Sequence, residues 1–347
     1  MRRVRSTGAM RIGKALLMVP IIAWIIATLV FLALRVVPGD PTASLAAGAG
    51  AGGGEQFEET RQRIESELKL DESTWEQYVT YLKGLIHLDL GHSFFGGADV
   101  LSLLRDSVPV TLELTIAAML IATVLGVISG IIAAMRQQTW VDTSIRGLST
   151  VGFSLPWFAL GVLSIVVFGV WLQWLPTLGR LPNSLSYDPI TNFVLIDSVL
   201  QDRTDLVWPW IQHLILPATT LALTLAGFIT RMVRAAVLDV LNDDHVRTAR
   251  MKGLSERMVV QRHVLRNASL PIVTVLGLQF GSLLGGAVIT EAVFSYPGVG
   301  SLLVQSINQR DYIVVQGAAL AIAFMFTFVN VVVDLLYLSL DPRLRRA

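Results

Sequence analysis

Long apolar runs separated by polar segments dominate the chain, and their lengths support a first prediction. The runs cover residues 15–34, 114–135, 147–179, 208–230, 267–290 and 312–333. Each is long enough to cross the hydrocarbon core of a membrane, which takes roughly 20 residues at a rise of about 1.5 Å each. None alternates polar and apolar side chains as a barrel strand must. The pattern therefore predicts an all-α polytopic membrane protein with six transmembrane helices.

The first apolar run resembles a secretory signal peptide in one respect. Arg2, Arg3 and Arg5 precede it, as basic residues precede the core of a signal peptide. However, its apolar stretch is longer than a typical signal core, and five further runs follow it. We therefore predict that it is an uncleaved first transmembrane helix.

The composition agrees with a membrane protein and excludes some chemistry. Hydrophobic residues make up 53% of the chain and charged residues 15%, with a mean hydropathy of +0.61. Soluble domains contain about 25% charged residues. The chain has no cysteine, which excludes a disulfide framework, a thiolate nucleophile and cysteine metal ligands.

The positions of the 27 Lys and Arg residues predict the orientation. With a cytoplasmic N-terminus, most of them fall in segments on the cytoplasmic side. These are Arg2, Arg3, Arg5, Arg11, Lys14, Arg136, Arg146, Arg231, Arg234, Arg247, Arg250, Lys252, Arg257, Arg262, Arg266, Arg343, Arg345 and Arg346. Six spans with both termini in the cytoplasm satisfy this distribution.

Three segments then face outward, residues 36–107, 180–207 and 294–311. The first is the largest and carries many more carboxylates than bases. Two of its stretches, "EQFEETRQRIESELKL" and "TWEQYVTYLKGLIHL", place apolar residues along one side of a helix. We therefore expect this outer segment to be a small folded cap.

Motifs that would indicate catalysis or nucleotide binding are incomplete. Gly48, Gly50 and Gly53 form a G-x-G-x-x-G, but it follows a predicted span and not a strand, so it is interpreted as a flexible linker. The sequence lacks G-x-x-x-x-G-K-[ST], and none of its five histidines forms H-E-x-x-H. Glu113 and Asp334 both lie near span ends, where carboxylates reach the interface, which argues against an aspartyl pair. No catalytic, cofactor or metal residue is predicted.

Two groups of residues near the fifth run are candidates for a transport pathway or gate. Gly277, Gly281 and Gly285 recur at four-residue spacing, which suits either close helix packing or a bare face along a pathway. Glu291 and Asp311 flank the "FSYPGVG" turn. These two carboxylates either bind a substrate ammonium group at the outer mouth or cap helices and accept backbone N–H groups.

The stretch between the fourth and fifth runs has the turn chemistry of a projecting elbow. Residues 246–251 suit a short helix, which Gly253 can end. Ser255 is a good N-cap for a second helix, and Glu256 in its first turn suits the helix dipole. Pro271 is predicted to start the fifth span, where its missing N–H costs least.

At these residues the sequence resembles a known family. "RTARMKG" at 247–253 followed by "HVLRNASLP" resembles the EAA loop of ABC importer permeases, in the B-type subunit of dipeptide, oligopeptide and nickel importers. Arg247 and Thr248 replace the first Glu and Ala of the general motif, and the interval to Leu270 and Pro271 is longer. Both departures are shared by the peptide-type subfamily. Further similar stretches are "RVVPGDP", "LDLGHS", "PVTLELTIAAMLIA", "EAVFSYPGVGSLLVQSINQRDY" and "LYLSLDPRLR".

The resemblance implies a type I ABC importer permease in a bacterial inner membrane. Its expected partners are a homologous second permease, two cytoplasmic ABC ATPases, an extracytoplasmic binding protein and the bilayer, with no nucleic acid. ATP and Mg²⁺ would bind to the partner ATPases. The implied divisions are 1–35 (cytoplasmic N-terminus and first helix), 36–107 (extracytoplasmic cap), 108–341 (five-helix core with coupling loop 236–270) and 342–347 (cytoplasmic tail).

The resemblance also implies roles for residues of the elbow. Ala249, Gly253, Leu254 and Glu256 are expected to contact the ATPase or form the turn, and Arg247 and Arg250 to pair with its acidic residues. The expected substrate is a dipeptide or oligopeptide. The alternative is an importer of nickel or another small solute. A proton-coupled secondary transporter is disfavoured because charged mid-span residues and inverted repeats are not seen.

Overall fold

The computed structural model describes residues 20–32, 62 and 73–340, and within these residues the protein is helical. The first described helix is apolar and covers Pro20–Leu32. The others are α4 (Thr74–Ile86), α5 (Val100–Met135), α6 (Trp140–Ser154), α7 (Trp157–Ser164), α8 (Val194–Leu200), α9 (Val207–Leu241), α10 (Asp244–Met251), α11 (Glu256–Met258), α12 (Leu265–Phe294), α13 (Val299–Gln309) and α14 (Tyr312–Leu340). In the described ranges, the extended pairing is limited to an isolated bridge between His92 and Asp99.

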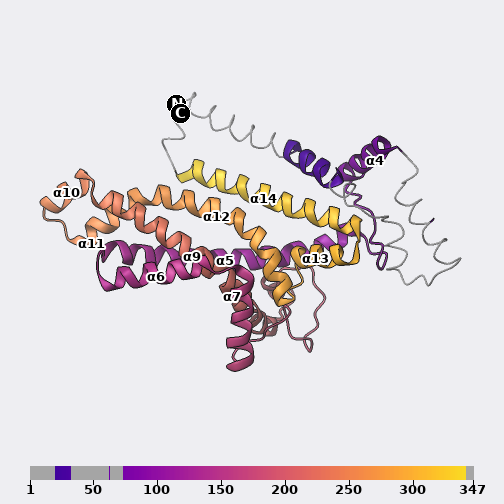
Figure 1. The fold of residues 1–347 in the computed structure, drawn as a ribbon, viewed down its shortest axis with the longest axis horizontal. Helices are drawn as coiled ribbons and strands as arrows, with labels where there is room; N and C mark the ends of the chain where they lie inside the picture. The colour runs from indigo at the N-terminus through magenta and orange to yellow at the C-terminus, as the bar shows by residue number, and fades with distance from the viewer. Residues whose placement is uncertain (1–19, 33–61, 63–72, 341–347) are drawn as a thin grey trace.

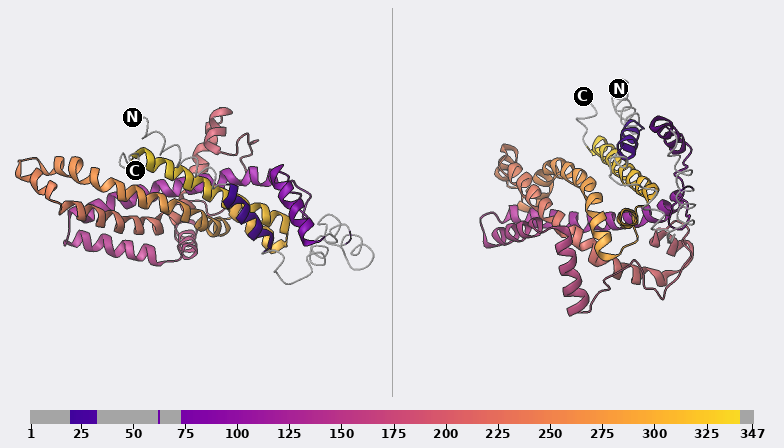
Figure 2. Two further views of the ribbon diagram at one scale, coloured as in Figure 1. Left: turned by 90° about the horizontal axis from the view of Figure 1, so that it is seen from above. Right: turned by 45° about the vertical axis from the view of Figure 1, so that its right-hand side comes forward.

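The longest helices lie side by side along the long axis (Figure 1 and Figure 2). Four helical segments are long and apolar enough to cross a membrane, and a bent pair makes a fifth. The first helix is a shorter apolar helix in its described part. The all-α prediction is thus confirmed for the described residues, and the six-helix count remains a prediction.

The packed centre is the pairing of α5 with α9. Gly126 and Gly130 of α5 face Ile229 and Val233 of α9, and an added Cβ would lie only 2.6 and 2.7 Å from them. Small residues at such positions allow backbones to approach closely, which is how helices associate in membranes. Helices α6 and α12 pack on α9 from other sides, and α14 packs on α12.

The second span begins earlier than predicted. Helix α5 starts at Val100, where Asp99 caps it by accepting a hydrogen bond from the Ser102 N–H, and it continues through Pro109. The sequence prediction began at residue 114 because the preceding segment contains charged residues. In the structure Glu113 and Asp106 accept hydrogen bonds from Arg180 and Asn192, so their polarity does not end the helix.

The third predicted span, residues 147–179, is not a straight helix. Helix α6 ends at Ser154, and α7 with the π-helical turn η1 (Ile165–Trp171) leaves at an angle of 102° (Figure 1). Pro156 causes the break: it lacks an N–H and disfavours helical geometry at the preceding residue, and Leu155 is extended (φ −83°, ψ 132°).

The prediction that Pro271 starts the fifth span is wrong. Helix α11, the π-helical turn η3 (Val259–Val264) and α12 form one uninterrupted run from Glu256 to Phe294, with Pro271 inside α12. Buried Val259, Val264 and Ala268 pack into the main core on the elbow side of the proline. This tertiary packing outweighs the local cost of the proline, which neighbouring helices help to offset in membrane proteins.

Helix α4 confirms the second predicted amphipathic helix of the outer segment. Ser73 and Glu76 form a capping box at its start. Its Tyr78 hydroxyl is hydrogen-bonded to Thr28 at 2.6 Å, and its ring packs edge-on against Phe31 of the first helix. The other predicted amphipathic stretch, the Gly-rich linker and the tail 342–347 lie outside the described residues.

Candidate functional site

An elbow formed by α10 and α11 projects at one end of the long axis, opposite the end that carries α4 and α13 (Figure 1). Helix α10 ends at Met251, and Gly253 adopts the left-handed conformation with φ +75°. Ser255 then occupies the N-cap position of α11 with extended backbone, although its side chain makes no capping hydrogen bond. The predicted Gly253 turn and two-helix elbow are confirmed.

Apolar packing fixes α10 to the span that follows. Val246 is fully buried and Ala249 is only 5% exposed. Both belong to the same core cluster as Val259, Val264 and Ala268. The elbow is therefore attached to the base of α12 as a stiff extension of that helix.

A two-point ion pair bridges the turn. Arg250 Nε donates to Glu256 Oε2 at 3.1 Å, and its Nη2 donates to Oε1 at 2.6 Å. The hydrogen bond to Glu256 raises the pKa of the Arg250 guanidinium further, so this side chain remains charged. Because both side chains are about half exposed, the pair adds little stability, but its fork geometry fixes the angle between α10 and α11.

A second polar contact joins the start of α10 to the start of α12. Asn267 Nδ2 donates to His245 Nε2 at 2.9 Å and to the His263 carbonyl at 2.7 Å. The elbow is thus held on both sides of its turn. These contacts join both ends of α10 to the helical run that follows the turn.

The outward face of the elbow is basic with an apolar tip. Met251 is 75% exposed and Met258 is 46% exposed. Arg247, Lys252 and Arg257 of the same segment are also exposed, together with the acidic residues Asp243, Asp244 and Glu256. Ala249 is buried and Leu254 is half-buried, so Ala249 packs inside the elbow, and its expected contact with an ATPase stays a prediction.

The predicted glycine stripe divides into two environments. Gly277 is buried, and a Cβ on Gly281 would come within 2.7 Å of the Phe326 ring, so α12 and α14 approach closely there. Gly285 has no atom within 4 Å of an added Cβ. It lines, with Gly281, an apolar groove of about 620 Å³ between the first helix, α12 and α14.

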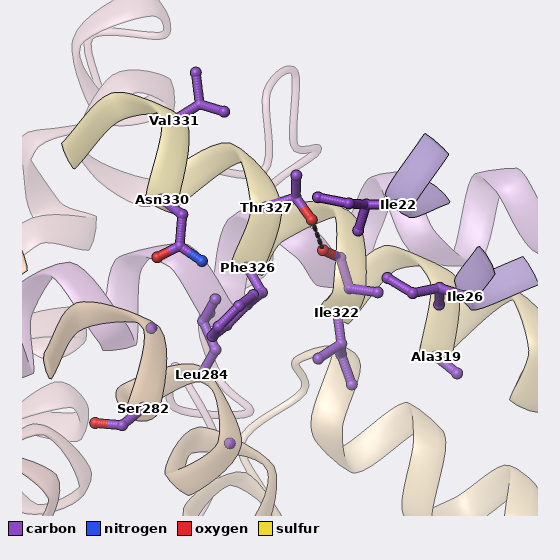
Figure 3. Close-up of a pocket in the computed structure, with 13 residues that line it drawn as sticks. Ile22, Ile26, Ser282, Leu284, Ala319, Ile322, Phe326, Thr327, Asn330 and Val331 are labelled. Carbon is purple, nitrogen blue, oxygen red and sulfur yellow. Dashed lines mark hydrogen bonds between the residues drawn. The ribbon is translucent and has the colours of Figure 1, made fainter. Parts of the chain in front are cut away.

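Figure 3 shows the groove, with Phe326 pointing from α14 toward α12 and with Ile22 and Ile26 of the first helix on the opposite side. Its polar groups are neutral: Ser282, Thr327 and Asn330. The stripe therefore contributes to helix packing and to the wall of a groove.

Glu291 is fully buried near the end of α12. Its Oε1 accepts from the Thr111 hydroxyl at 2.7 Å, and Oε2 accepts from the N–H groups of Gly300 and Ser301 at 2.7 and 3.1 Å. This carboxylate caps α13 and ties it to α5. The structure supports the capping interpretation and not exposure to substrate.

Asp311 also caps a helix. Its Oδ1 accepts from the Val314 N–H at the start of α14, and its Oδ2 accepts from the Ser93 hydroxyl at 2.6 Å and the Phe94 N–H at 3.1 Å. It is 1% exposed. This carboxylate links the segment before α5 to the last span, again as the capping interpretation predicted.

Comparison with known proteins decides the family. Residues 126–346 match the family described as "Binding-protein-dependent transport system inner membrane component". The chain belongs to this family. It is a permease, a multi-pass component of a bacterial inner membrane.

Relatives match the permease over nearly its whole length. It is 41% identical to the Di/tripeptide transport system permease protein DppB of Pseudomonas aeruginosa, covering 91% of this chain and 93% of the relative. It is 39% identical to the Dipeptide transport system permease protein DppB of Escherichia coli, covering 92% and 94%. Among solved structures, an inward-facing MetNI methionine ABC transporter chain superposes with a TM-score of 0.54 at 17% identity, covering 69% of the permease and 96% of that chain. This similarity supports an all-helical fold of the type I importer class.

Sequence reasoning missed two parts of the permease. Met251 and Met258 were not singled out, because only the packing of Val246 and Ala249 shows which face of α10 points outward. The ion pair of Arg180 with Glu113 joins residues far apart in the chain. The sequence signal for this pair was an acidic residue inside an apolar helix, which calls for a partner.

Proposed function

We propose that this permease is one half of the membrane channel of an ABC importer that moves dipeptides or oligopeptides into the cell. The support for the substrate is that the relatives are named as peptide transport permeases. The groove and the glycine stripe supply an uncharged wall for passage, in which neutral polar groups would meet the peptide backbone. Glu291 and Asp311 serve as structural caps beside it.

The elbow is the single observation that carries the mechanism. It is stiff, basic and continuous with α12, and its tip is an exposed methionine. ATP binds and is hydrolysed on two partner ATPases, whose closure pushes the elbow and shifts α12. A homologous second permease completes the channel, and an extracytoplasmic binding protein delivers the substrate. Both termini face the cytoplasm, on the same side as the elbow.

Uptake in a deletion strain tests the substrate. A strain lacking this permease is expected to lose uptake of labelled dipeptides or longer peptides and to regain it when the gene is restored. Nickel uptake is measured in parallel. Loss of nickel uptake with unchanged peptide uptake would contradict the peptide assignment and favour the small-solute alternative.

Met251→Glu tests the elbow tip. A buried apolar anchor at the centre of an interface contributes about 2 kcal/mol or more, so affinity for the ATPases is expected to fall roughly 30-fold or more. The measurement is co-purification of the ATPase subunits together with peptide uptake. Met251→Leu, which keeps an apolar side chain of similar size, is the control and is expected to retain both. Wild-type assembly of the Glu variant would show that the tip is not in the interface.

A further inference from the structure

The outer loop, residues 180–206, is anchored on one buried carboxylate of α5. The Glu113 side chain is 6% exposed and that of Arg180, at the start of the loop, is 9% exposed. Arg180 Nε and Nη2 donate to Glu113 Oε2 at 3.2 and 2.5 Å. This is a buried ion pair in which the carboxylate belongs to a span and the guanidinium to the loop.

The same carboxylate receives two further donors from other elements. The Val194 N–H, at the start of α8 in the middle of the loop, donates to Glu113 Oε1 at 2.6 Å. Trp210 Nε1, near the start of α9, donates to Oε2 at 3.2 Å. One side chain therefore positions the beginning and the middle of the loop against both central spans. Arg180 Nη2 also donates to the Asn192 carbonyl at 2.6 Å, which closes the loop on itself.

The hydrogen-bond geometry around the Glu113 carboxylate is more specific than a contribution to folding stability would require. Replacing a buried ion pair by apolar residues is often neutral or stabilising, because desolvation offsets the attraction. A single carboxylate with four directional donors instead fixes the position and register of the elements that bind it. Glu113 and Arg180 thus mainly determine the position of the loop.

The loop is placed against the outer end of α12. The Gly179 N–H, just before Arg180, donates to the Phe294 carbonyl, the last residue of α12, at 3.0 Å. Phe294 and Tyr296 of the following turn are 1% and 0% exposed. Since α12 is continuous with α11 of the elbow, the run from Glu256 to Phe294 has the elbow at one end and this loop contact at the other.

We propose that Glu113 and Arg180 are positioning residues that hold the outer loop against the outer end of α12. In this way they couple the outer surface to the elbow and make ATP hydrolysis depend on the binding protein. This inference rests on the proposed function. With the pair intact, movement of α12 at the elbow must displace a fixed outer loop, and the binding protein acts on that loop from outside. Without the ion pair, α12 moves independently of the loop.

The test uses the whole importer, with this permease, its partner permease and its ATPases in lipid nanodiscs. The main variant is Glu113→Gln with Arg180→Gln, which removes both charges together and leaves no unpaired buried charge. We expect basal ATPase activity to rise about fivefold, the lower end of typical couplings between sites. The stimulation by saturating binding protein is expected to be lost.

The chain offers a matched control in the same loop. Arg203 and Asp205 form an ion pair at 2.8 Å, but their side chains are 39% and 51% exposed. Arg203→Gln with Asp205→Asn likewise removes one positive and one negative charge, here both from the loop, without releasing the loop from α5. Stimulation by the binding protein is expected to remain at the wild-type value. A loss in the control equal to that in the main variant would overturn the proposal, because loop charge and not anchoring would then be responsible.

A milder variant covers the case in which the main variant does not assemble. Asn192 Nδ2 donates to Asp106 Oδ1 of α5 at 2.9 Å, which is a second, partly buried anchor of the loop. Asp106→Ala removes the acceptor of this bond and leaves Asn192, whose backbone is left-handed (φ +61°), unchanged. It loosens the loop and leaves the buried ion pair in place. It is expected to change the ratio of stimulated to basal ATPase activity in the same direction. An unchanged ratio in the assembled complex overturns the proposal. If wild-type complex itself shows no stimulation, the proposed function fails instead.

Discussion

Replacing Gly253 with valine is expected to abolish transport and leave the permease inserted in the membrane. Gly253 has φ +75°, and an added Cβ would meet no atom within 4 Å. The effect must therefore come from the backbone alone. Left-handed backbone costs an L-residue about 1–2 kcal/mol, and a β-branched side chain fits it worst. The exposed turn relieves this strain by rotating α10 away from its place on α12.

The consequence for coupling follows from how α10 is held. Its packing rests on Val246 and Ala249 and on the Arg250–Glu256 bridge across the turn. A rotation at Gly253 is expected to break this bridge and to move Met251 away from the ATPase contact that we propose for it. The measurements are ATPase activity and peptide uptake by the reconstituted importer, with ATPase activity expected to lose its dependence on substrate delivery.

Two further substitutions of Gly253 distinguish the effect of backbone strain from the effect of added charge. Asparagine tolerates left-handed backbone, so Gly253→Asn is expected to retain most uptake. Gly253→Asp has a similar backbone preference but adds a carboxylate among exposed bases. It is expected to abolish transport by opposing the acidic residues expected in the ATPase cleft. Normal uptake by both the valine and the aspartate variants would refute the elbow as the point of energy input.

Local chemistry made the elbow predictable from sequence. Glycine is the preferred residue just after a helix end and serine is a preferred N-cap, so Gly253 and Ser255 between two polar helical stretches favoured a turn. The continuation of α11 into α12 was not predictable in that way. It depends on the core contacts of Val259 and Val264, which sequence neighbours do not reveal. The proline rule at Pro271 failed for the same reason.

The bent third span shows the opposite case, in which a sequence signal was present. Pro156 lies in the middle of the uncharged run 147–179, and proline disfavours helix at the residue before it. Hydropathy alone treated this run as one span. The start of α5 was missed because Arg105, Asp106 and Glu113 are charged. The partners of Asp106 and Glu113 lie in a loop more than sixty residues away.

The elements of the candidate site could be predicted from the sequence. Which of their side chains are exposed and which are buried could not. The sequence identified the elbow, the glycine stripe and the two carboxylates. Which side of α10 points outward depends on tertiary packing, and so does the burial of Glu291. The two interpretations of Glu291 and Asp311 were equally compatible with sequence, because a buried cap and an exposed ligand use the same residue type.

Glu291→Ala is expected to remove most folded permease from the membrane. It leaves the N–H groups of Gly300 and Ser301 and the Thr111 hydroxyl without their acceptor in a buried site. Each orphaned group costs about 1–3 kcal/mol, against a total folding free energy of about 5–15 kcal/mol. The measurement is the amount of permease in membranes and its melting temperature in detergent. Glu256→Ala, an exposed glutamate, is the control for expression.

Glu291→Gln distinguishes the cap from a substrate ligand. The amide keeps an acceptor oxygen near the α13 N–H groups, so enough permease is expected to fold for uptake assays. The buried cap touches no substrate, so any loss of uptake follows the amount of folded protein. It is therefore equal for free and N-acetylated peptides. An ammonium-binding carboxylate would instead lose uptake of free peptides selectively, since N-acetylation removes the charge that it would bind. A selective loss in this variant would return Glu291 to the transport pathway, against the burial and hydrogen bonding seen in the structure.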